Sequence, residues 1–514
     1  MKHAKSFVFI IAIGIFTISC SNKDTKNIIS VKKASTEKFI GAFEKFENNF
    51  MLRSDIFDNG SAKAEFFLTD YDLQGPKSQD ILQTTTIADM MIKNKIGITG
   101  LWVNDKKAKA FKYSYTLNNI LKNEEKTDLI NIVIGQKNIE AASPSIFNKT
   151  FSIPAQDFGK ALALAAPKEF PSNLNIDLTY NTLRTLNSIR PNKASQKRYD
   201  KAQDILYKNA IITQNGDTYS IVFNNDDVIK FIPALLDAVK NDNRIKGIWI
   251  IYEKLLQKEF KEIEEKFNTE IKDKIKDYTF TEELTIKGNF ITKDRYIVVS
   301  GEKEIINFDF GIKNYENPLD GMTYAINIAD PKLIDKDTNA DILSFVFASE
   351  GTVTDTVADI DYSLAMSFTN NSGDSSFANF DMHCYFYADT TQQDDNFEVG
   401  MEATAHGNLD SEDKDTKQTL MNITMQAVGS VAKTPDMITY KIDTIDMDME
   451  IPGTEEYAVR LGTDASVIFS KNILEDISMP TETVKVLETK VSEWQAIKEE
   501  ITANLSALST LLNL

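Results

Sequence analysis

Residues 278–471 constrain the fold more than any other part of this chain, because apolar and polar side chains alternate there over many successive segments. Polar turns rich in Asn, Asp, Gly and Ser separate the segments, for example at residues 370–374. A period of two is typical of strands with one buried face, and strands joined by short turns pair antiparallel. The pattern predicts strands at Tyr296–Ser300, Ile306–Ile312, Thr323–Ile328, Ile342–Ala348, Ile360–Phe368, Phe380–Ala388, Phe397–Ala405, Leu420–Val428, Ile438–Ile451 and Tyr457–Phe469.

A long amphipathic segment follows these strands. Residues 480–514 have the pattern of a helix with one apolar stripe, and such a helix needs an apolar surface to cover. We therefore expect helix 480–514 to pack on a face of the sheet. The residues of the stripe are Leu487, Val491, Trp494, Ile497, Ile501, Leu505, Leu508 and Leu512.

The first half of the chain has two further patterns. Residues 62–115 alternate with a period of two, which predicts an antiparallel meander, and a helix capped at Ser35 or Thr36 precedes it. Residues 173–277 have mostly helical periodicity, which the predicted strand Thr218–Phe223 interrupts.

The patterns together predict an α+β fold, with large curved antiparallel β-sheets that are half-barrel-like and packed with amphipathic helices. We expect two lobes joined by a helical segment. Residues 36–172 would form an N-terminal α+β lobe, residues 173–277 the mostly helical segment, and residues 278–514 a C-terminal β-rich lobe. This order of elements loosely resembles the half-barrel lipoproteins of the LolA and LppX type, in which a curved antiparallel sheet wraps helices around an apolar cavity.

The first twenty residues have the pattern of an export signal. A short basic start precedes an apolar run at residues 7–16, which is too short to span a bilayer. The run leads into Ile18, Ser19 and Cys20, and polar residues follow at once. This segment resembles the signal peptide and lipobox of bacterial lipoproteins, although Thr17 stands where Leu is usual. The resemblance implies that residues 1–19 are removed and that Cys20 is lipidated.

An ordinary cleaved signal with an incidental cysteine is the alternative. The chain has only one other cysteine, Cys384, and this favours the lipoprotein interpretation. Residues 20–35 would then form a lipidated polar tether. The protein would be exported and anchored to a membrane of the cell envelope, at the periplasmic face or the cell surface.

The composition limits the partners. The formal net charge is −19, and an acidic protein is repelled by phosphate backbones, so we expect no nucleic acid among its partners. The membrane, reached through the lipid anchor, and a lipid or other hydrophobic ligand are the expected partners. The sequence does not identify a protein partner.

The chain offers few catalytic groups. His383 and Cys384 are neighbours in a predicted strand, so their side chains point to opposite faces and cannot form a nucleophile–base pair. Residues 335–341 start like a calcium loop, but Ala340 replaces the turn glycine and Val346 the bidentate glutamate. We interpret the acidic ladder on strand 438–451 as a solvated face. We therefore predict no catalytic residue, no cofactor and no metal site.

Methionines are concentrated in the predicted sheet, since ten of the fourteen lie after residue 300. Met421, Ile423 and Met425 share one strand face, and Met447 and Met449 share another. Methionine fills irregular apolar space and adapts to varied partners. The two sets form either a core beneath the C-terminal helix or the lining of a lipid-binding or other hydrophobic site.

Three functions remain open from the sequence. The first is a membrane-anchored extracytoplasmic lipoprotein that binds a lipid or another hydrophobic ligand without catalysis. The second is a surface-exposed interaction or structural lipoprotein. The third is a carboxylate-dependent hydrolase, for which 76 Asp and Glu residues leave no pair distinguished.

Overall fold

The computed structural model gives the arrangement of the chain in the ranges that follow. It describes residues 23–74, 79–118, 126–166, 170, 176, 178–186, 191–242, 253–329, 341–370, 376–392, 396–407, 418–450 and 457–512. The expected signal peptide and Cys20 lie outside the described residues, so the export segment stays a prediction.

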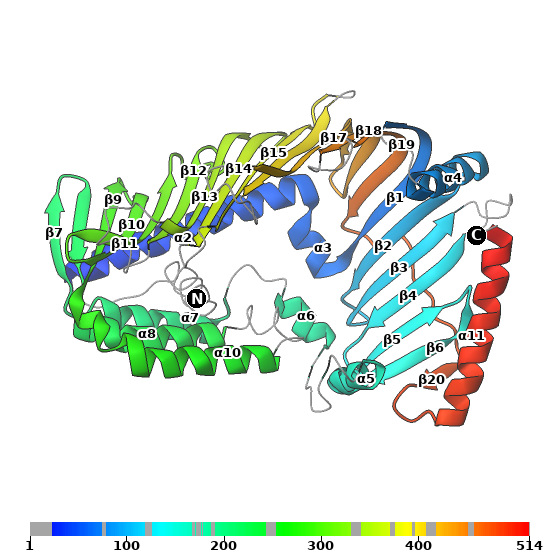
Figure 1. The fold of residues 1–514 in the computed structure, drawn as a ribbon, viewed down its shortest axis with the longest axis horizontal. Helices are drawn as coiled ribbons and strands as arrows, with labels where there is room; N and C mark the ends of the chain where they lie inside the picture. Colours follow the sequence, from blue (N-terminus) through cyan, green and yellow to red (C-terminus); the bar gives the residue numbers. More distant parts are fainter. Residues whose placement is uncertain are drawn as a thin grey trace.

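All strands of the described chain belong to one large, open, curved sheet of twenty strands (Figure 1). Its pairings are antiparallel except between the last strand and β6. The strands run in the spatial order β7 through β19, then β1 through β6, then β20. Their bounds are β1 (Gly60–Gln74), β2 (Gly97–Asp105), β3 (Ala110–Asn118), β4 (Thr127–Ile134), β5 (Asn138–Ser143), β6 (Phe147–Pro154), β7 (Ile211–Asn215), β8 (Thr218–Val222), β9 (Tyr278–Lys287), β10 (Phe290–Ser300), β11 (Lys303–Ile312), β12 (Met322–Ala329), β13 (Asp341–Val353), β14 (Val357–Asn370), β15 (Ser376–Asp389), β16 (Phe397–Gly407), β17 (Gln418–Lys433), β18 (Met437–Glu450), β19 (Tyr457–Ser470) and β20 (Thr483–Lys485).

The β-rich α+β fold with a curved antiparallel sheet is as predicted, but the strands form one continuous sheet rather than separate sheets. β1 pairs with β2 on one edge and with β19 on the other, from Ser61 opposite Ser470 to Gln74 opposite Ala458. This pairing joins the strands of the first and last parts of the chain into one sheet. Strands β7 and β8, inside the expected helical segment 173–277, extend the same sheet at its other end.

The ten strands predicted between residues 296 and 469 are all present, each within one or two residues of an observed strand or inside a longer one. The prediction missed β5, β6, β7, β9 and β20. Curvature has a local cause, because register shifts lie side by side on neighbouring strands at Val428/Gly429, Ile442/Thr444 and Leu68/Asp70. Such bulges increase the twist and bend the sheet.

Several helices cover part of one side of this sheet (Figure 1). The two longest are α2 (Lys23–Met51) and α11 (Val491–Leu512). The others are α3 (Arg53–Asn59), α4 (Gln79–Asn94), α5 (Phe158–Ala165), α6 (Tyr180–Leu186), α7 (Lys193–Leu206), α8 (Asn225–Lys240) and α10 (Glu253–Lys266).

Helix α2 corrects the expectation of a polar tether at residues 20–35. It begins at Lys23 rather than near Ser35, and Ile28 and Ile29 are only 1% and 0% exposed. The tether prediction was wrong because the large apolar side chains of this segment, Ile28, Ile29 and Val31, are too few to show a helical period among the polar ones. They nonetheless fall on one side of the helix and pack against α7, α8 and β8–β10.

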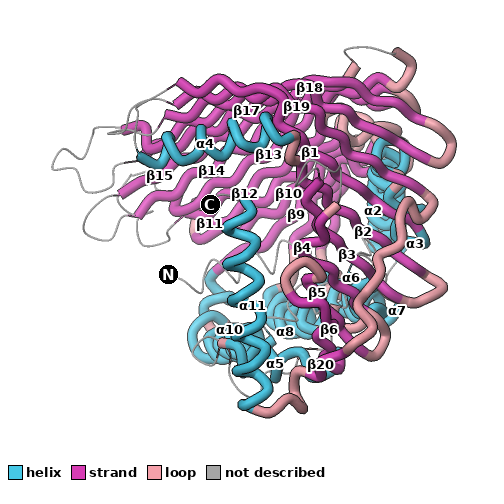
Figure 2. Tube along the Cα trace, turned by 90° about the vertical axis from the view of Figure 1, so that its right-hand side faces the viewer, coloured by secondary structure: helices cyan, strands magenta, loops and turns pink. Residues whose placement is uncertain are grey.

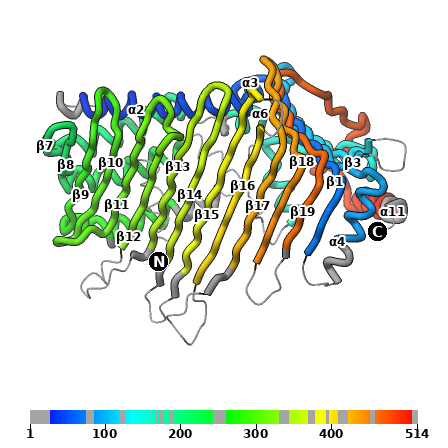
Figure 3. The backbone as a smooth tube through the Cα atoms, turned by 90° about the horizontal axis from the view of Figure 1, so that it is seen from above, coloured from blue at the N-terminus to red at the C-terminus, as the bar shows by residue number. Residues whose placement is uncertain are grey.

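We call the face of the sheet that packs against α2 the inner face, and it carries Ile360, Phe397 and Tyr440. The opposite face is the outer face. Helix α2 crosses the strands near one of their two ends (Figure 3). Its first half belongs to a core with α7, α8 and α10 over β8–β10, and its second half, with α3, packs on β14–β19.

The C-terminal helix also differs from the prediction. It begins at Val491, not at residue 480, and it lies beside β6 and β20 at the edge of the sheet (Figure 2). Trp494 stacks on Phe151, with 6.0 Å between ring centroids. The preceding segment leaves β19 and crosses the outer face of β2, where Ile477 packs on Leu101 and Val103. The apolar stripe therefore marked a helix that contacts the sheet at Trp494 near its edge and leaves Val491 and Leu505 exposed.

Candidate functional site

The five residues predicted to line a hydrophobic site lie together on the inner face. Met425 of β17 is directly opposite Met447 of β18, and Ile423 is directly opposite Met449. Met421 lies two residues before Ile423, on the same face of β17. The two predicted sets of methionines therefore form one continuous surface across two neighbouring strands.

This surface extends over many more strands. Directly opposed residues form three rows that cross the strands on the inner face, which we call the apolar rows. The first row is Ile326, Phe345, Met366, Phe380, Ala405 and Met421, on β12–β17. The second row is Phe347, Leu364, Met382, Ala403, Ile423 and Met449, on β13–β18. The third row is Tyr362, Cys384, Met401, Met425, Met447, Val459 and Leu73, on β14–β19 and β1.

Two methionines of the apolar rows are much more exposed than the residues that α2 and α3 cover on the same face. Met366 and Met425 are 39% and 38% exposed, whereas Ile360 and Ile438, farther along the same face, are 1% and 0% exposed. The difference follows from α2 and α3, which pack on the buried ends of these strands through residues such as Phe50. In the described part of the chain, the core of α2 and α3 reaches the apolar rows only at Tyr362.

The apolar rows contain no charged residue, while acidic side chains occupy the outer face of the same strands. Asp381, Glu402 and Asp448 are all exposed there. The acidic ladder predicted at Asp446, Asp448 and Glu450 belongs to this outer face, and Asp446 lies 3.4 Å from Arg460. The sheet is thus amphipathic, with an uncharged inner surface and an acidic outer one.

His383 and Cys384 point to opposite faces, as the sequence predicted. Cys384 lies in the third apolar row, opposite Tyr362, and burial raises the pKa of its thiol. His383 lies on the outer face, 3.3 Å from Asp361. The two side chains therefore do not form a nucleophile–base pair.

A second cluster of interest, the buried ion cluster, joins α2 to the sheet. Lys32 of α2 forms an ion pair with Glu282, contacts Asp294 at 2.8 Å and donates a hydrogen bond of 2.6 Å to the Tyr296 hydroxyl. The Tyr207 hydroxyl donates to Glu282. Lys32 and Glu282 are 4% and 0% exposed. Two carboxylates thus share one buried cation.

The charge balance perturbs Asp294. Burial raises the pKa of its carboxyl to about 8, although Lys32 acts in the opposite direction. Its Oδ1 atom is buried and accepts no hydrogen bond within the described structure. Perturbed carboxylates mark functional sites when a substrate can reach them. Lys32 and Glu282 are buried in the packing between α2 and the sheet, so we interpret the cluster as a contact that holds α2 on β9 and β10.

Sequence reasoning missed this cluster. Lys32 stood in the expected tether and Glu282 in a strand that was not predicted, and no short motif connects them. Only the long-range packing of α2 brings the two residues together.

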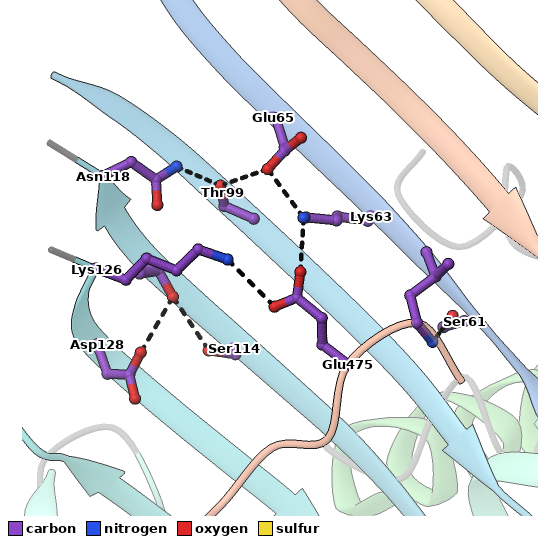
Figure 4. Close-up of polar contacts among 11 residues, drawn as sticks. Ser61, Lys63, Glu65, Thr99, Ser114, Asn118, Lys126, Asp128 and Glu475 are labelled. Atoms are coloured by element: carbon purple, nitrogen blue, oxygen red, sulfur yellow. Dashed lines mark hydrogen bonds and ion pairs between the residues drawn. The ribbon is translucent and has the colours of Figure 1, made fainter. Parts of the chain in front are cut away.

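A third group of polar residues lies on the outer face of β1–β4 (Figure 4). Lys63 contacts Glu65 at 3.0 Å and Glu475 at 2.7 Å, and Lys126 lies 3.4 Å from Glu475. Ser61 accepts a hydrogen bond from the backbone N–H of Leu474. These contacts, which the dashed lines in Figure 4 trace, hold the segment after β19 against the sheet.

Glu65 and Glu475 both contact Lys63, so this pair of carboxylates bears on the hydrolase hypothesis. The hydrogen bond that Glu475 accepts from Lys63 lowers the pKa of the Glu475 carboxyl. Burial lowers the pKa of Lys63, but the hydrogen bonds to Glu475 and Glu65 outweigh it and raise that pKa overall. A carboxylic general acid needs a raised pKa. Glu475 is held in its ionised form, so the geometry suits an ion-paired brace rather than an acid–base pair.

Two further properties concern ions and membranes. Among the described residues, no group of three or more His, Cys, Asp and Glu side chains is arranged to hold a metal ion. No described helix is both long enough and apolar enough to cross a membrane.

Comparisons with known proteins add little. No family model matches the chain, and no curated protein matches it. Among solved structures, the crystal structure of Pseudomonas aeruginosa OccK5 (OpdH) matches 80% of this chain and 96% of its own, with 7% identity and a TM-score of 0.18. The CymD monoaromatic hydrocarbon channel matches 83% of this chain and 92% of its own, with 6% identity and a TM-score of 0.19. At such low TM-scores neither similarity carries an argument about fold or function.

Proposed function

We propose that this protein is a lipid-anchored protein of the cell envelope that binds a lipid or another hydrophobic ligand on the apolar rows, without catalysis. The observation that carries the proposal is the amphipathic sheet, whose inner surface is apolar, uncharged and partly exposed at the strand ends that α2 and α3 do not cover.

The free energy of burial supports a hydrophobic ligand. Covering apolar surface contributes about 25 cal/mol for each Å² removed from water. Met401, Met425 and Met447 stand side by side on neighbouring strands. Their flexible side chains adapt to an irregular partner better than branched side chains do. A ligand with apolar chains would therefore gain free energy over the whole set of rows.

Lipid extraction after purification tests the binding proposal. The full-length protein should retain lipid through detergent removal, and Met425→Lys should retain several-fold less, because the new ammonium group would be desolvated by an apolar ligand. Mass spectrometry of the extract and native mass spectrometry of the protein measure both.

Thr424→Lys is the matched control. Thr424 is the neighbouring residue on β17, but it lies on the outer face between Glu402 and Asp448, which favour a lysine. It should retain lipid like the wild type. Equal loss in both variants, or no retained lipid in the wild type, contradicts the proposal.

The anchor needs a separate experiment. Cys20→Ala should move the full-length protein from the detergent-rich to the aqueous phase and abolish labelling by a fatty-acid analogue. Its circular dichroism spectrum should not change, because the first described core residue is Ile28. Cys384→Ala, which removes the other cysteine, should keep both the label and the partitioning. A wild type found wholly in the aqueous phase would refute the anchor.

A further inference from the structure

We infer that the apolar rows form a track for the acyl chains of diacyl phospholipids, which lie across the strands, and that the track holds more than one phospholipid at a time. The inference rests on the proposed function, because it takes lipid binding to the rows as given. It adds the class of ligand, its direction and its number.

The length of the rows is the first argument. The third row crosses seven strands without interruption, from Tyr362 on β14 to Leu73 on β1. Six inter-strand spacings of about 4.8 Å give a path of about 29 Å. The hydrocarbon core of a bilayer, which contains two layers of acyl chains, is about 30 Å thick, so one layer spans about 15 Å. The row is about twice as long as one lipid tail.

The width of the surface is the second argument. Residues that share a face of one strand are two positions apart, which places neighbouring rows about 7 Å from each other. Met421, Ile423 and Met425 contribute one residue to each of the three rows. Three parallel rows give a surface wide enough for two chains lying side by side, as in a diacyl lipid.

The absence of charged side chains from the apolar rows limits what can bind there. The rows hold no ion or ion pair, so whatever lies on them must present an uncharged surface of comparable length. An extended protein segment of that length would bring backbone N–H and C=O groups, which the side chains of the rows cannot satisfy, and a helical partner would need an uncharged face as long as the row. Acyl chains carry no polar groups along their length. A charged head group would then remain at the margin of the sheet, in contact with water.

The continuity of the sheet makes the track continuous as well. Because β19 pairs with β1, the third row passes from the C-terminal strands to Leu73 without a gap. Ile98 of β2 and Tyr115 of β3, which are 42% and 51% exposed, also lie on the inner face, but Ile98 is opposite Phe66, seven positions before Leu73 on β1. The third row therefore ends at β1.

The test counts bound lipids. The full-length protein is incubated with vesicles of phosphatidylcholine, recovered, and examined by native mass spectrometry. We expect the wild type to carry at least two phosphatidylcholine molecules. Met366→Lys on β14 and Met447→Lys on β18 lie four strand spacings apart, about 19 Å, which exceeds the length of one tail. Each should lower the maximum number of lipids but leave at least one bound, and the double variant should lose nearly all.

Two outer-face variants control for added charge. Ala365→Lys and Thr424→Lys place lysine beside Asp381 and Asp448 and should bind lipid like the wild type. If the wild type saturates at one lipid and either inner-face variant abolishes it, the protein has a single site. The track is then refuted, while the proposed function stands. If the wild type binds no phosphatidylcholine, or if the outer-face variants lose as much as the inner-face ones, both proposals fail.

Discussion

Helices cover the sheet differently at the two ends of α2. The difference distinguishes residues that stabilise the fold from residues that we propose bind a ligand. Over β8–β10, helices α2, α7, α8 and α10 bury one face in a large core, with Tyr199, Ile221 and Leu235 at most 1% exposed. Over β14–β18, α2 and α3 bury only one end of the strands, and the apolar rows at the other end stay half-exposed. The same alternating pattern thus gives a closed core in one region and an open surface in the other.

Apolar periodicity therefore identifies which face of a strand is apolar, but it does not identify what covers that face. Near β9 and β10, the cover is specific enough to tolerate a buried ion pair between Lys32 and Glu282. Such pairs add little net stability but destabilise strongly when one partner is removed. The apolar rows contain no buried ion pair of this kind. Substitutions should therefore act mainly on stability in the first region and mainly on binding in the second.

The largest effect is expected at Lys32. Lys32→Ala leaves Glu282 and Asp294 buried without their cation, which should lower the free energy of unfolding by about 3–5 kcal/mol. Urea denaturation followed by circular dichroism measures the change. Lys38→Ala, on the same helix, removes a largely exposed pair with Glu316 and should cost less than about 1 kcal/mol. Equal losses would mean that the cluster does not fasten α2.

Aromatic truncation compares the two regions directly. Phe50 is 0% exposed between α2 and β14–β18, so Phe50→Ala should cost about 3–5 kcal/mol. Phe345, in the first apolar row, is half-exposed, and Phe345→Ala should cost about 1 kcal/mol. The same denaturation experiment, run without lipid, gives both values. A loss at Phe345 as large as that at Phe50 would show that the row is covered.

Some of this organisation could be predicted from the sequence and some could not. The strands after residue 296 were predictable because their alternation is local, and the same alternation placed Met425 and Met447 on the faces where they lie. The pairing of β1 with β19 was not, because either edge of a strand can accept a partner hundreds of residues away. The role of Lys32 was hidden for the same reason. Whether the methionines formed a core or a surface depended on where α2 and α11 pack.

The pH dependence of stability should follow Asp294. Burial raises the pKa of this carboxyl to about 8 in the folded protein, above about 3.9 in the unfolded chain. Between these values the folded state binds a proton that the unfolded state lacks, so the contribution is complete below about pH 4 and is lost as the pH rises through 8. Lys32, Glu282, Tyr207 and Tyr296 face the carboxyl, and the pKa of Lys32 is raised, so the cation persists across this window.

Denaturation curves at several pH values measure this slope. Between pH 6 and pH 8 the wild type should lose about 2 kcal/mol through this group. Asn cannot titrate, so the free energy of unfolding of Asp294→Asn should not show this loss between pH 6 and pH 8. Asp361→Asn, on the exposed outer face, should behave like the wild type. Parallel curves for the wild type and Asp294→Asn would show that the carboxyl does not carry the proton.

The smallest effect on stability is expected at Met425, which can be compared with the buried Val431 on the same strand. Without lipid, Met425→Ala should cost less than about 1 kcal/mol, because much of the side chain is already in water. Val431→Ala removes a 2% exposed side chain from the same face of β17 and should cost about 2 kcal/mol. A ligand that binds only the folded state adds stability in proportion to its affinity. Phospholipid should therefore stabilise the wild type and Val431→Ala alike but Met425→Ala less, so the loss at Met425 grows toward that at Val431 when lipid is present. If the two losses are unchanged by phospholipid, the open end of the sheet is not where lipid binds.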